Sequence, residues 1–104
     1  NLCGPDAVKR LAVIESATCF ISATGFDAAR GPMDPNPLEI EAKRALAGKA
    51  RRVVLLLEGS KWGRPAACVT LHPRRIHAII TNRQPPPEVA GMLRANGVRV
   101  LLAR

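Results

Sequence analysis

A chain of 104 residues with 47% hydrophobic and 3% aromatic content can form one small domain whose core is mainly aliphatic. No apolar run approaches the ~20 residues of a membrane span, no signal segment opens the sequence, and the three cysteines form no C-x-x-C pair. These patterns predict a cytoplasmic protein without a disulfide framework or a metal site. The net charge of +8 comes from scattered lysines and arginines without aromatic platforms for bases, which favours a solvated basic surface over a nucleic-acid-binding face.

Hydrophobic periodicity predicts that strands and helices alternate along the chain. Asn36-Pro37 is typical of a helix start, Asn96-Gly97 of a helix end, and the glycine and prolines over 27–36 predict an irregular loop. The expected elements are helices over 5–14, from 37 to about 50 and after the prolines at 85–87, and strands over 17–23, 53–57, 67–71, 76–81 and 98–102. This alternation predicts an α/β fold with three layers, α/β/α, and a mostly parallel sheet.

The helix expected from residue 37 presents an apolar stripe and charged flanks. The residues predicted to face the core are Leu38, Ala42, Ala45 and Leu46. Glu39 and Lys43 are four residues apart and are expected to form a surface salt bridge. Glu41 falls on the edge of the stripe, so its carboxylate either reaches into solvent or faces a site.

The strand over 53–57 consists of five apolar residues, which predicts a strand buried on both faces of a parallel sheet. It ends at once in Glu58, Gly59, Ser60 and Lys61. Ligands of open α/β sheets bind beyond the carboxyl ends of the strands, and a lysine there can act as a point charge for phosphate. The alternatives are a plain surface turn and a salt bridge between Glu58 and Lys61.

Other strand ends bring further candidates to the same edge of the sheet. Gly25 follows the first strand, and Thr81 and Asn82 follow the strand over 76–81. For Trp62, packing is favoured over stacking on a sugar. The two histidines have no carboxylate or cysteine at ligand spacing, and no nucleophilic triad, P-loop or dinucleotide fingerprint is present. No catalytic residue, metal or cofactor is therefore predicted.

These residues together resemble the effector-binding domain of the DeoR family of bacterial transcriptional repressors. The family pattern has a strand ending in a glycine-containing turn, a helix with an acid and a Lys-Arg-Ala run, an apolar strand ending in Asp-Ser-Ser-Lys-Phe-Gly, and an Ile-Thr-Asp. The matching segments are 20–27, 39–45, 53–64 and 80–82. Three residues depart from the pattern: Glu58 replaces Asp, Gly59 replaces the first Ser, and Asn82 replaces Asp.

The resemblance implies a fold similar to ribose-5-phosphate isomerase, glucosamine-6-phosphate deaminase and coenzyme A transferases. It implies that residues 1–104 form the C-terminal part of a sensor domain for a phosphorylated sugar or related metabolite. In the family, a winged helix-turn-helix on the N-terminal side binds DNA. We expect that reader and the first part of the sensor to be absent from this chain, DNA to be bound only through the reader, and the regulator to be a cytoplasmic homo-oligomer.

Three functions are compatible with these residues. The first is a sensor domain without catalysis, whose effector is held by Lys61, Ser60 and the other strand-end residues. The second is a sugar-phosphate isomerase or deaminase of the same fold, in which Glu58 or Glu41 would act as the general base. The third is a basic nucleic-acid-binding module, which the scattered charges favour least.

Overall fold

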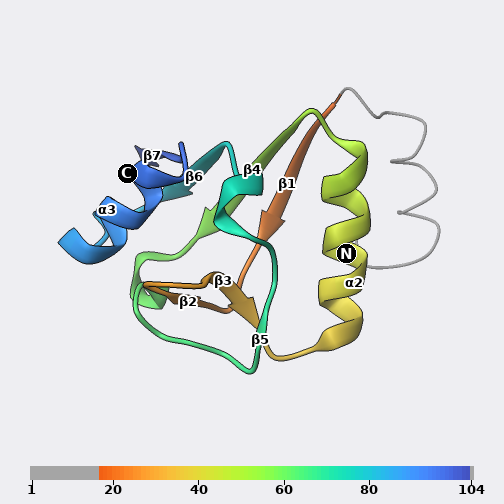
Figure 1. Cartoon of the computed structure of the whole chain (residues 1–104), viewed down its shortest axis with the longest axis horizontal. Coiled ribbons are helices and arrows are strands. Elements are labelled where there is room, and N and C mark those ends of the chain that lie inside the picture. The colour runs from red at the N-terminus through yellow and green to blue at the C-terminus, as the bar shows by residue number, and fades with distance from the viewer. Residues whose placement is uncertain (1–16, 104) are drawn as a thin grey trace.

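The computed structural model describes residues 17–103 and contains both helices and strands, as the sequence predicts (Figure 1). Strict alternation is not observed, because β2 and β3 precede α2 and no α-helix lies between β4 and β6. The helix expected over 5–14 lies outside the described residues. Four parallel strands form the main sheet in the order β1-β4-β6-β7. They are β1 (Thr18–Ser22), β4 (Arg52–Leu57), β6 (Ala78–Thr81) and β7 (Arg99–Leu102). The α/β class and the parallel sheet are thereby confirmed.

Helix α2 (Pro37–Lys49) joins β1 to β4, and α3 (Pro87–Ala95) joins β6 to β7. The side-chain oxygen of Asn36 accepts the backbone N–H of Leu38 at 2.9 Å, so the predicted cap of α2 is confirmed. After α3, Gly97 has φ +74°, the left-handed conformation that commonly ends a helix.

A second sheet fills the segment that was predicted to be an irregular loop, so that prediction is wrong. It is antiparallel, with the order β2-β3-β5, and consists of β2 (Gly25–Asp27), β3 (Gly31–Asp34) and β5 (Cys68–Val69). Asp27 closes the β2–β3 turn by accepting the N–H groups of Ala29 and Arg30, and Gly31 adopts φ +87°. Glycine and proline therefore shape a tight hairpin here.

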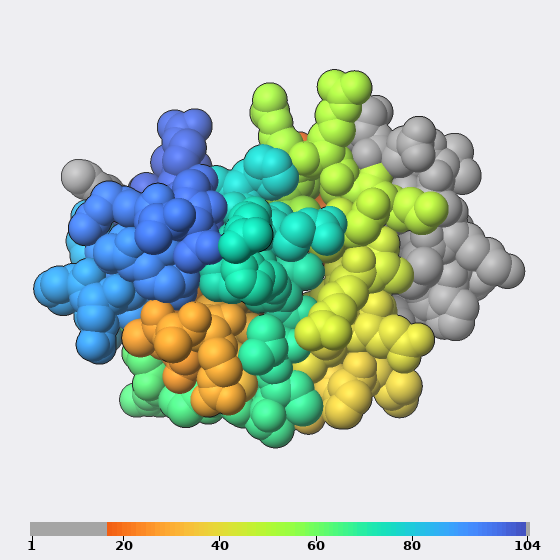
Figure 2. All heavy atoms as spheres, viewed as in Figure 1, coloured from red at the N-terminus to blue at the C-terminus, as the bar shows by residue number. Residues whose placement is uncertain are grey.

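All connections of the main sheet run over one face of it. The chain moves from β1 to β4, β6 and β7 in one direction, and right-handed crossovers in one direction place their connecting segments on the same side. In Figure 2, the segment after β4 and the β2–β3 hairpin lie between the C-terminal part of the chain and α2. Short 3₁₀ turns η1 (Gly59–Lys61) and η2 (Pro73–Arg75) belong to these connections.

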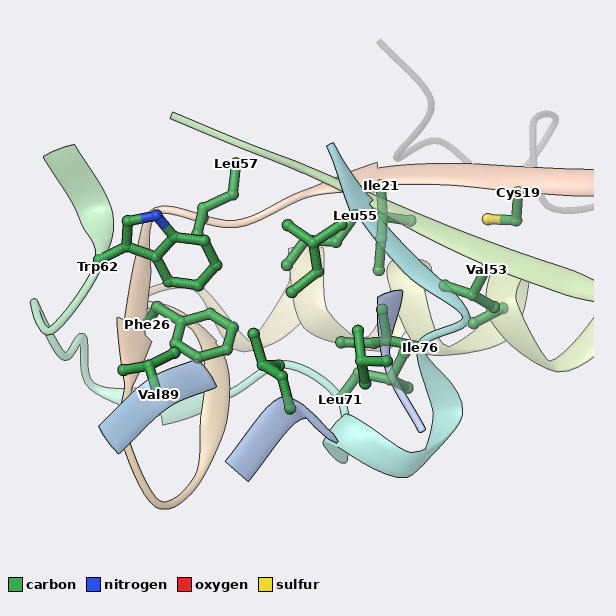
Figure 3. Close-up of a cluster of buried hydrophobic side chains, with 14 of the residues drawn as sticks. Cys19, Ile21, Phe26, Val53, Leu55, Leu57, Trp62, Leu71, Ile76 and Val89 are labelled. Atoms are coloured by element: carbon green, nitrogen blue, oxygen red, sulfur yellow. The ribbon is translucent and has the colours of Figure 1, made fainter. Parts of the chain in front are cut away.

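We call the face over which these connections run the inner face of the main sheet. The core lies between this face and the segments that cover it. Side chains of the strands point toward those of the second sheet, η2 and α3 in Figure 3. The labelled members are Cys19, Ile21, Val53, Leu55 and Leu57 from the strands, and Phe26, Trp62, Leu71, Ile76 and Val89 from the cover. Leu46 and Ala47 of α2 belong to the same cluster. One continuous core therefore holds both helices to the sheet.

The prediction that 53–57 is buried on both faces is wrong for the described residues. Val53, Leu55 and Leu57 are at most 3% exposed, whereas Leu56 is 44% exposed. Neighbouring side chains of a strand point to opposite faces. The apolar side chains of 53–57 therefore lie on both faces of the sheet, but other parts of residues 17–103 pack only against the inner face.

The predicted stripe of α2 is wrong at its start. Leu38 is 76% exposed, and the expected surface pair of Glu39 with Lys43 does not form. The residues of α2 that are buried are Ile40, Ala42, Lys43, Leu46 and Ala47. Lys43 faces inward because its ammonium group pairs with a buried carboxylate, Asp34. The helix is therefore rotated about its axis relative to the prediction, and Leu38 faces outward.

Candidate functional site

The turn after β4 is a compact polar structure at the carboxyl edge of the parallel sheet. Lys61 donates its backbone N–H to the Glu58 carbonyl at 2.9 Å, which closes the 3₁₀ turn. The Ser60 hydroxyl donates to the Glu58 carboxylate at 2.8 Å. Neither of the two ion pairs among residues 17–103 involves Lys61, so the alternative of a Glu58–Lys61 salt bridge is not realised in the structure.

This turn is held against the end of β6. The Gly59 N–H donates to the Asn82 side-chain oxygen at 2.7 Å. A Cβ atom on Gly59 would lie 2.3 Å from Cβ of Arg83 and 2.9 Å from that Asn82 oxygen, which real structures do not tolerate. The absence of a side chain at residue 59 therefore lets the two strand ends approach.

Trp62 fixes the far side of the same turn. Its indole N–H donates to the Arg83 carbonyl at 2.9 Å, and its ring meets Phe26 edge-on with centroids 4.8 Å apart. The side chain is only 8% exposed. The predicted packing role of Trp62 is thus confirmed, and the turn rests on a rigid base.

A pocket of about 300 Å³ opens at the carboxyl ends of β4 and β6. Its lining residues are Leu56, Leu57, Glu58, Ile80, Thr81, Asn82 and Ala103. Three of the predicted site residues, Glu58, Thr81 and Asn82, therefore meet around one hollow. Ser60 is joined to the hollow through its bond to Glu58, and Gly59 through its bond to Asn82.

Lys61 belongs to the turn after Glu58 but is not among the residues that line the hollow. Two further predicted site residues, Gly25 and Glu41, lie elsewhere. Gly25 packs against the backbone after η1, where a Cβ atom would lie 2.2 Å from the Arg64 carbonyl oxygen. Its neighbour Phe26 donates its N–H to the same oxygen at 2.8 Å. The lack of a side chain at Gly25 thus serves close backbone packing.

Glu41 is exposed on α2 and lines a different hollow of about 490 Å³ between α2 and β5. In that hollow, the Arg44 guanidinium donates to the carbonyls of Val69 and Thr70, each at 2.9 Å. Arg44 thereby ties α2 to the edge strand β5.

A polar cluster of three buried residues and the exposed Thr24, which the sequence reasoning missed, lies beside the end of β1. Asp34 is 2% exposed, and its carboxylate accepts the hydroxyls of Thr24 at 2.6 Å and Thr70 at 2.5 Å. The Lys43 ammonium lies 3.1 Å from it and also donates to the Ser22 carbonyl at 2.5 Å. We call Asp34, Lys43, Thr24 and Thr70 the Asp34 cluster.

The electrostatics of the Asp34 cluster are balanced. Burial raises the pKa of Asp34, but hydrogen bonds from Thr24, Thr70 and Lys43 and the charge of Lys43 together hold that pKa below its ordinary value. No buried side-chain polar atom among residues 17–103 lacks a partner. A signal was present in the sequence, since Lys43 lies three residues after Ile40 and four before Ala47, in an otherwise apolar stripe.

Both histidine rings accept a hydrogen bond from a backbone N–H group. The ring nitrogen Nδ1 of His77 accepts the Val53 N–H at 3.0 Å, and Nδ1 of His72 accepts the Arg74 N–H at 3.0 Å. Cys19, predicted to be a core residue, is 3% exposed, and burial raises the pKa of its thiol. Within residues 17–103, no group of metal-ligating side chains is found.

The fold and the carboxyl edge of the parallel sheet define a class of protein: an α/β domain with polar strand ends around a small pocket. Comparison with known families is more specific. Residues 1–83 match the model of the DeoR C terminal sensor domain, which covers most of the chain. The chain therefore belongs to the DeoR family of transcriptional regulators through its sensor domain.

Two curated relatives agree with this assignment. The chain is 34% identical over 64 residues to the HTH-type transcriptional regulator IolR of Bacillus subtilis (strain 168), which covers 62% of this chain and 26% of the relative. It is 34% identical over 71 residues to the HTH-type transcriptional regulator GolR of Listeria innocua, which covers 68% of this chain and 28% of the relative. The chain thus spans about a quarter of the length of these relatives. No helix among residues 17–103 is long and apolar enough to cross a membrane.

Proposed function

We propose that this chain is the effector-binding part of a DeoR-type transcriptional repressor, and that its effector is a phosphorylated sugar or a related anionic metabolite. The effector would lie at the carboxyl ends of β4 and β6, in the pocket bounded by Glu58, Thr81 and Asn82. The observation that carries the proposal is the η1 turn, which directly follows Glu58 of the pocket lining and carries Ser60 and Lys61. Lys61 has no ion-pair partner among the described residues.

The chemistry of the turn suits a sugar phosphate. Lysine is a compact positive charge with three donors and commonly serves as a point-charge contact for phosphate. Lys61, Arg64 and Arg83 all lie on or next to the two loops that meet there, with Glu58 as the one carboxylate of the turn. Glu58 and Asn82 offer oxygen and amide groups for the hydroxyls of a sugar. The excess of positive charge favours the phosphate end of the ligand near Lys61.

In the whole regulator, effector binding would change the affinity of a separate winged helix-turn-helix for DNA. The names of the two relatives describe HTH-type regulators, which supports this arrangement. DNA would be contacted through that separate domain, the regulator would act as a homo-oligomer, and it would work in the cytoplasm.

The test uses the full-length regulator and matched ligand pairs. Each sugar phosphate of a panel is compared with its unphosphorylated sugar in thermal unfolding, followed by titration calorimetry of those that stabilise. A ligand at about 100 times its Kd should stabilise the folded state by roughly 2.7 kcal/mol, and removal of the phosphate should abolish this. Equal stabilisation by a sugar and its phosphate, or no stabilisation by any phosphate, would contradict the proposal.

A further inference from the structure

Basic side chains gather at the amino edge of the parallel sheet, where its strands begin, opposite the pocket. The strands are parallel, so their first residues and the segments that lead into them meet at this edge. Figure 1 shows the beginnings of β1 and β4 beside the last turn of α2, at the end of the molecule opposite the start of α2. Six exposed residues, which we call the basic edge, belong to these segments: Lys49, Arg51, Arg52, Arg74, Arg75 and Arg99.

The sheet itself holds three members of the basic edge. Arg51 donates its backbone N–H to the Ala17 carbonyl at 3.2 Å, and Arg52 is the first residue of β4. Arg99 is the first residue of β7, and the register sets it two positions further along the sheet than Arg52. With strands ~4.8 Å apart and ~3.3 Å between residues, the Cα atoms of Arg52 and Arg99 lie about 12 Å apart. Their side chains project on the same side of the sheet, because alternate residues of a strand share a face.

The other three members reach the same edge from the connections. Arg74 and Arg75 belong to η2, which leads into β6. His77 follows them and donates its backbone N–H to the Val53 carbonyl at 2.9 Å, so the end of η2 lies beside the start of β4. Lys49 is the last residue of α2, just before β4. The fold thus brings together charges that are scattered along the sequence.

The negative charges of the described residues lie elsewhere. The six acidic residues among 17–103 belong to segments that follow the carboxyl ends of β1, β4 and β6: Asp27, Asp34, Glu39, Glu41, Glu58 and Glu88. Neither of the two ion pairs within residues 17–103 includes a member of the basic edge. The basic side chains that donate hydrogen bonds within this range are Lys43 and Arg44. The like charges of the basic edge therefore repel one another without compensation from residues 17–103.

Helix dipoles account for only part of this separation of charge. Acidic residues favour the first turn of a helix and basic residues the last, and both α2 and α3 begin after the carboxyl end of one strand and end before the next strand begins. This preference explains Glu39, Glu88 and Lys49, which lie in such turns. It does not explain the five arginines of the basic edge, which all lie outside the α-helices of residues 17–103. Their gathering at one edge therefore has a cause other than helix stability.

We propose that the basic edge binds the phosphate backbone of DNA when the full-length regulator occupies its binding site. The guanidinium group of arginine matches the oxygens of a phosphate as a fork of donors. The inference rests on the proposed function only in requiring a separate DNA reader, which would hold the duplex close to the sensor. Recognition of bases would stay with that reader, because contacts to phosphate position a protein but carry no sequence information. The basic edge would thus add the same affinity for every DNA sequence.

A second copy of the chain matches the basic edge less well than DNA does. The carboxylates of Asp27 and Asp34 already have ion-pair partners within the chain, and Glu58 directly precedes a turn that contains Lys61. The surface at the carboxyl edge is therefore mixed in charge. Double-stranded DNA, by contrast, carries one negative charge per ~1.7 Å of helix axis.

The salt dependence of DNA binding by the full-length regulator tests this inference. The probes are a duplex that wild type selects from a random-sequence pool and a scrambled duplex of the same composition. Each phosphate contact contributes about 0.9 to the slope of log K against log salt. The double variants Arg51→Gln/Arg52→Gln and Arg74→Gln/Arg75→Gln should therefore each reduce the slope by about 1 to 2 on both duplexes. Arg30→Gln removes an exposed arginine from the β2–β3 turn and, as the matched control, should keep the wild-type slope.

The possible outcomes are distinct. Wild-type slopes for both double variants would overturn the inference, and so would a change confined to the selected duplex, because that would place these arginines in base readout. Wild-type slopes together with a lower oligomer mass in sedimentation would overturn it in favour of a second copy as the partner. Failure of wild type to bind any DNA would sink the proposed function as well, whereas normal binding by all variants would sink the basic edge alone.

Photocrosslinking covers the case in which a double variant perturbs folding. Arg75→Cys and the control Arg30→Cys are each coupled to an azidophenacyl group and irradiated on the selected duplex. Wild type, treated in the same way, sets the background of the native cysteines. The yield of protein–DNA crosslinks above this background should be at least ten times higher from residue 75 than from residue 30. Equal yields from the two positions would contradict a DNA contact at the basic edge.

Discussion

Two polar clusters, the Asp34 cluster and the η1 turn, lie beside the carboxyl edge of the sheet. They differ in how many of their polar groups have a hydrogen-bond or ion-pair partner. Asp34, Lys43 and Thr70 of the Asp34 cluster are buried and Thr24 is exposed. The Asp34 carboxylate accepts three side-chain donors at 2.5 to 3.1 Å. The η1 turn is open: Glu58 is exposed, and Ser60 and Lys61 are partly exposed. A buried cluster whose polar groups are paired stabilises a fold. The Lys61 ammonium group, in contrast, has no ion-pair partner among residues 17–103 and can still contact a ligand.

Removal of one partner from the Asp34 cluster is the strongest way to test this contrast. Lys43→Met leaves the Asp34 carboxylate buried without its cation, which should cost about 3–5 kcal/mol of the free energy of unfolding. Urea denaturation of the full-length protein measures it, with Lys49→Met at the exposed end of α2 as the control. A loss below about 1 kcal/mol, equal to that of the control, would show that the cluster is not a structural anchor.

A smaller effect is expected when the η1 turn is forced away from β6. Gly59→Ala places a methyl group 2.3 Å from Cβ of Arg83, and overpacking of this kind typically costs about 1–3 kcal/mol. Gly48→Ala is the matched control, since no atom lies within 4 Å of the position that its methyl group would take and alanine favours a helix interior by up to ~1 kcal/mol. The two variants should therefore shift the urea midpoint in opposite directions, and a shift in the same direction would refute the close approach.

The smallest stability effect is a pH dependence of the Asp34 cluster. The pKa of Asp34 is lowered in the folded state, so the unfolded chain binds its proton first as the pH falls. The stability that this carboxylate contributes is present above about pH 4, the ordinary range of an aspartate, and is lost as the pH falls through the folded pKa. The difference in free energy of unfolding between wild type and Asp34→Asn should thus shrink between about pH 5 and the acid limit, measured by urea denaturation. A constant difference would show that Asp34 is not a charged partner.

The local sequence pattern predicted most of the helices and strands, but not which of their faces are buried. The apolar runs, the Asn36 cap and the Asn96-Gly97 end are local signals, and the structure follows them. The burial of Leu56, by contrast, depends on which side of the sheet the connections take, and that of Leu38 depends on the pairing of Lys43 with Asp34. No single segment encodes either of these. The β2–β3 hairpin was missed because its glycine and prolines also suit an irregular loop.

The candidate site was also predicted only in part. Polar residues after parallel strands meet at one edge by geometry, which is why Glu58 and Asn82 line one pocket. The Asp34–Lys43 pair escaped notice because Asp34 belongs to the segment predicted as a loop and Lys43 was placed on the surface. Leu56 and Ile80 also line the pocket, and only the topology of the sheet places them on the face that residues 17–103 leave uncovered.

Titration calorimetry of Lys61→Ala in the full-length regulator tests the central claim most directly. A charge-assisted hydrogen bond contributes roughly 1.5–3 kcal/mol, so the affinity for the sugar phosphate that binds wild type should fall about 10-fold to 100-fold. The free energy of unfolding of Lys61→Ala should equal that of wild type, because Lys61 has no ion-pair partner among residues 17–103. Lys49→Ala, which removes an exposed lysine from α2, should bind as wild type does. Equal affinity of wild type, Lys49→Ala and Lys61→Ala for every phosphate ligand would contradict the assignment of the η1 turn as the effector site.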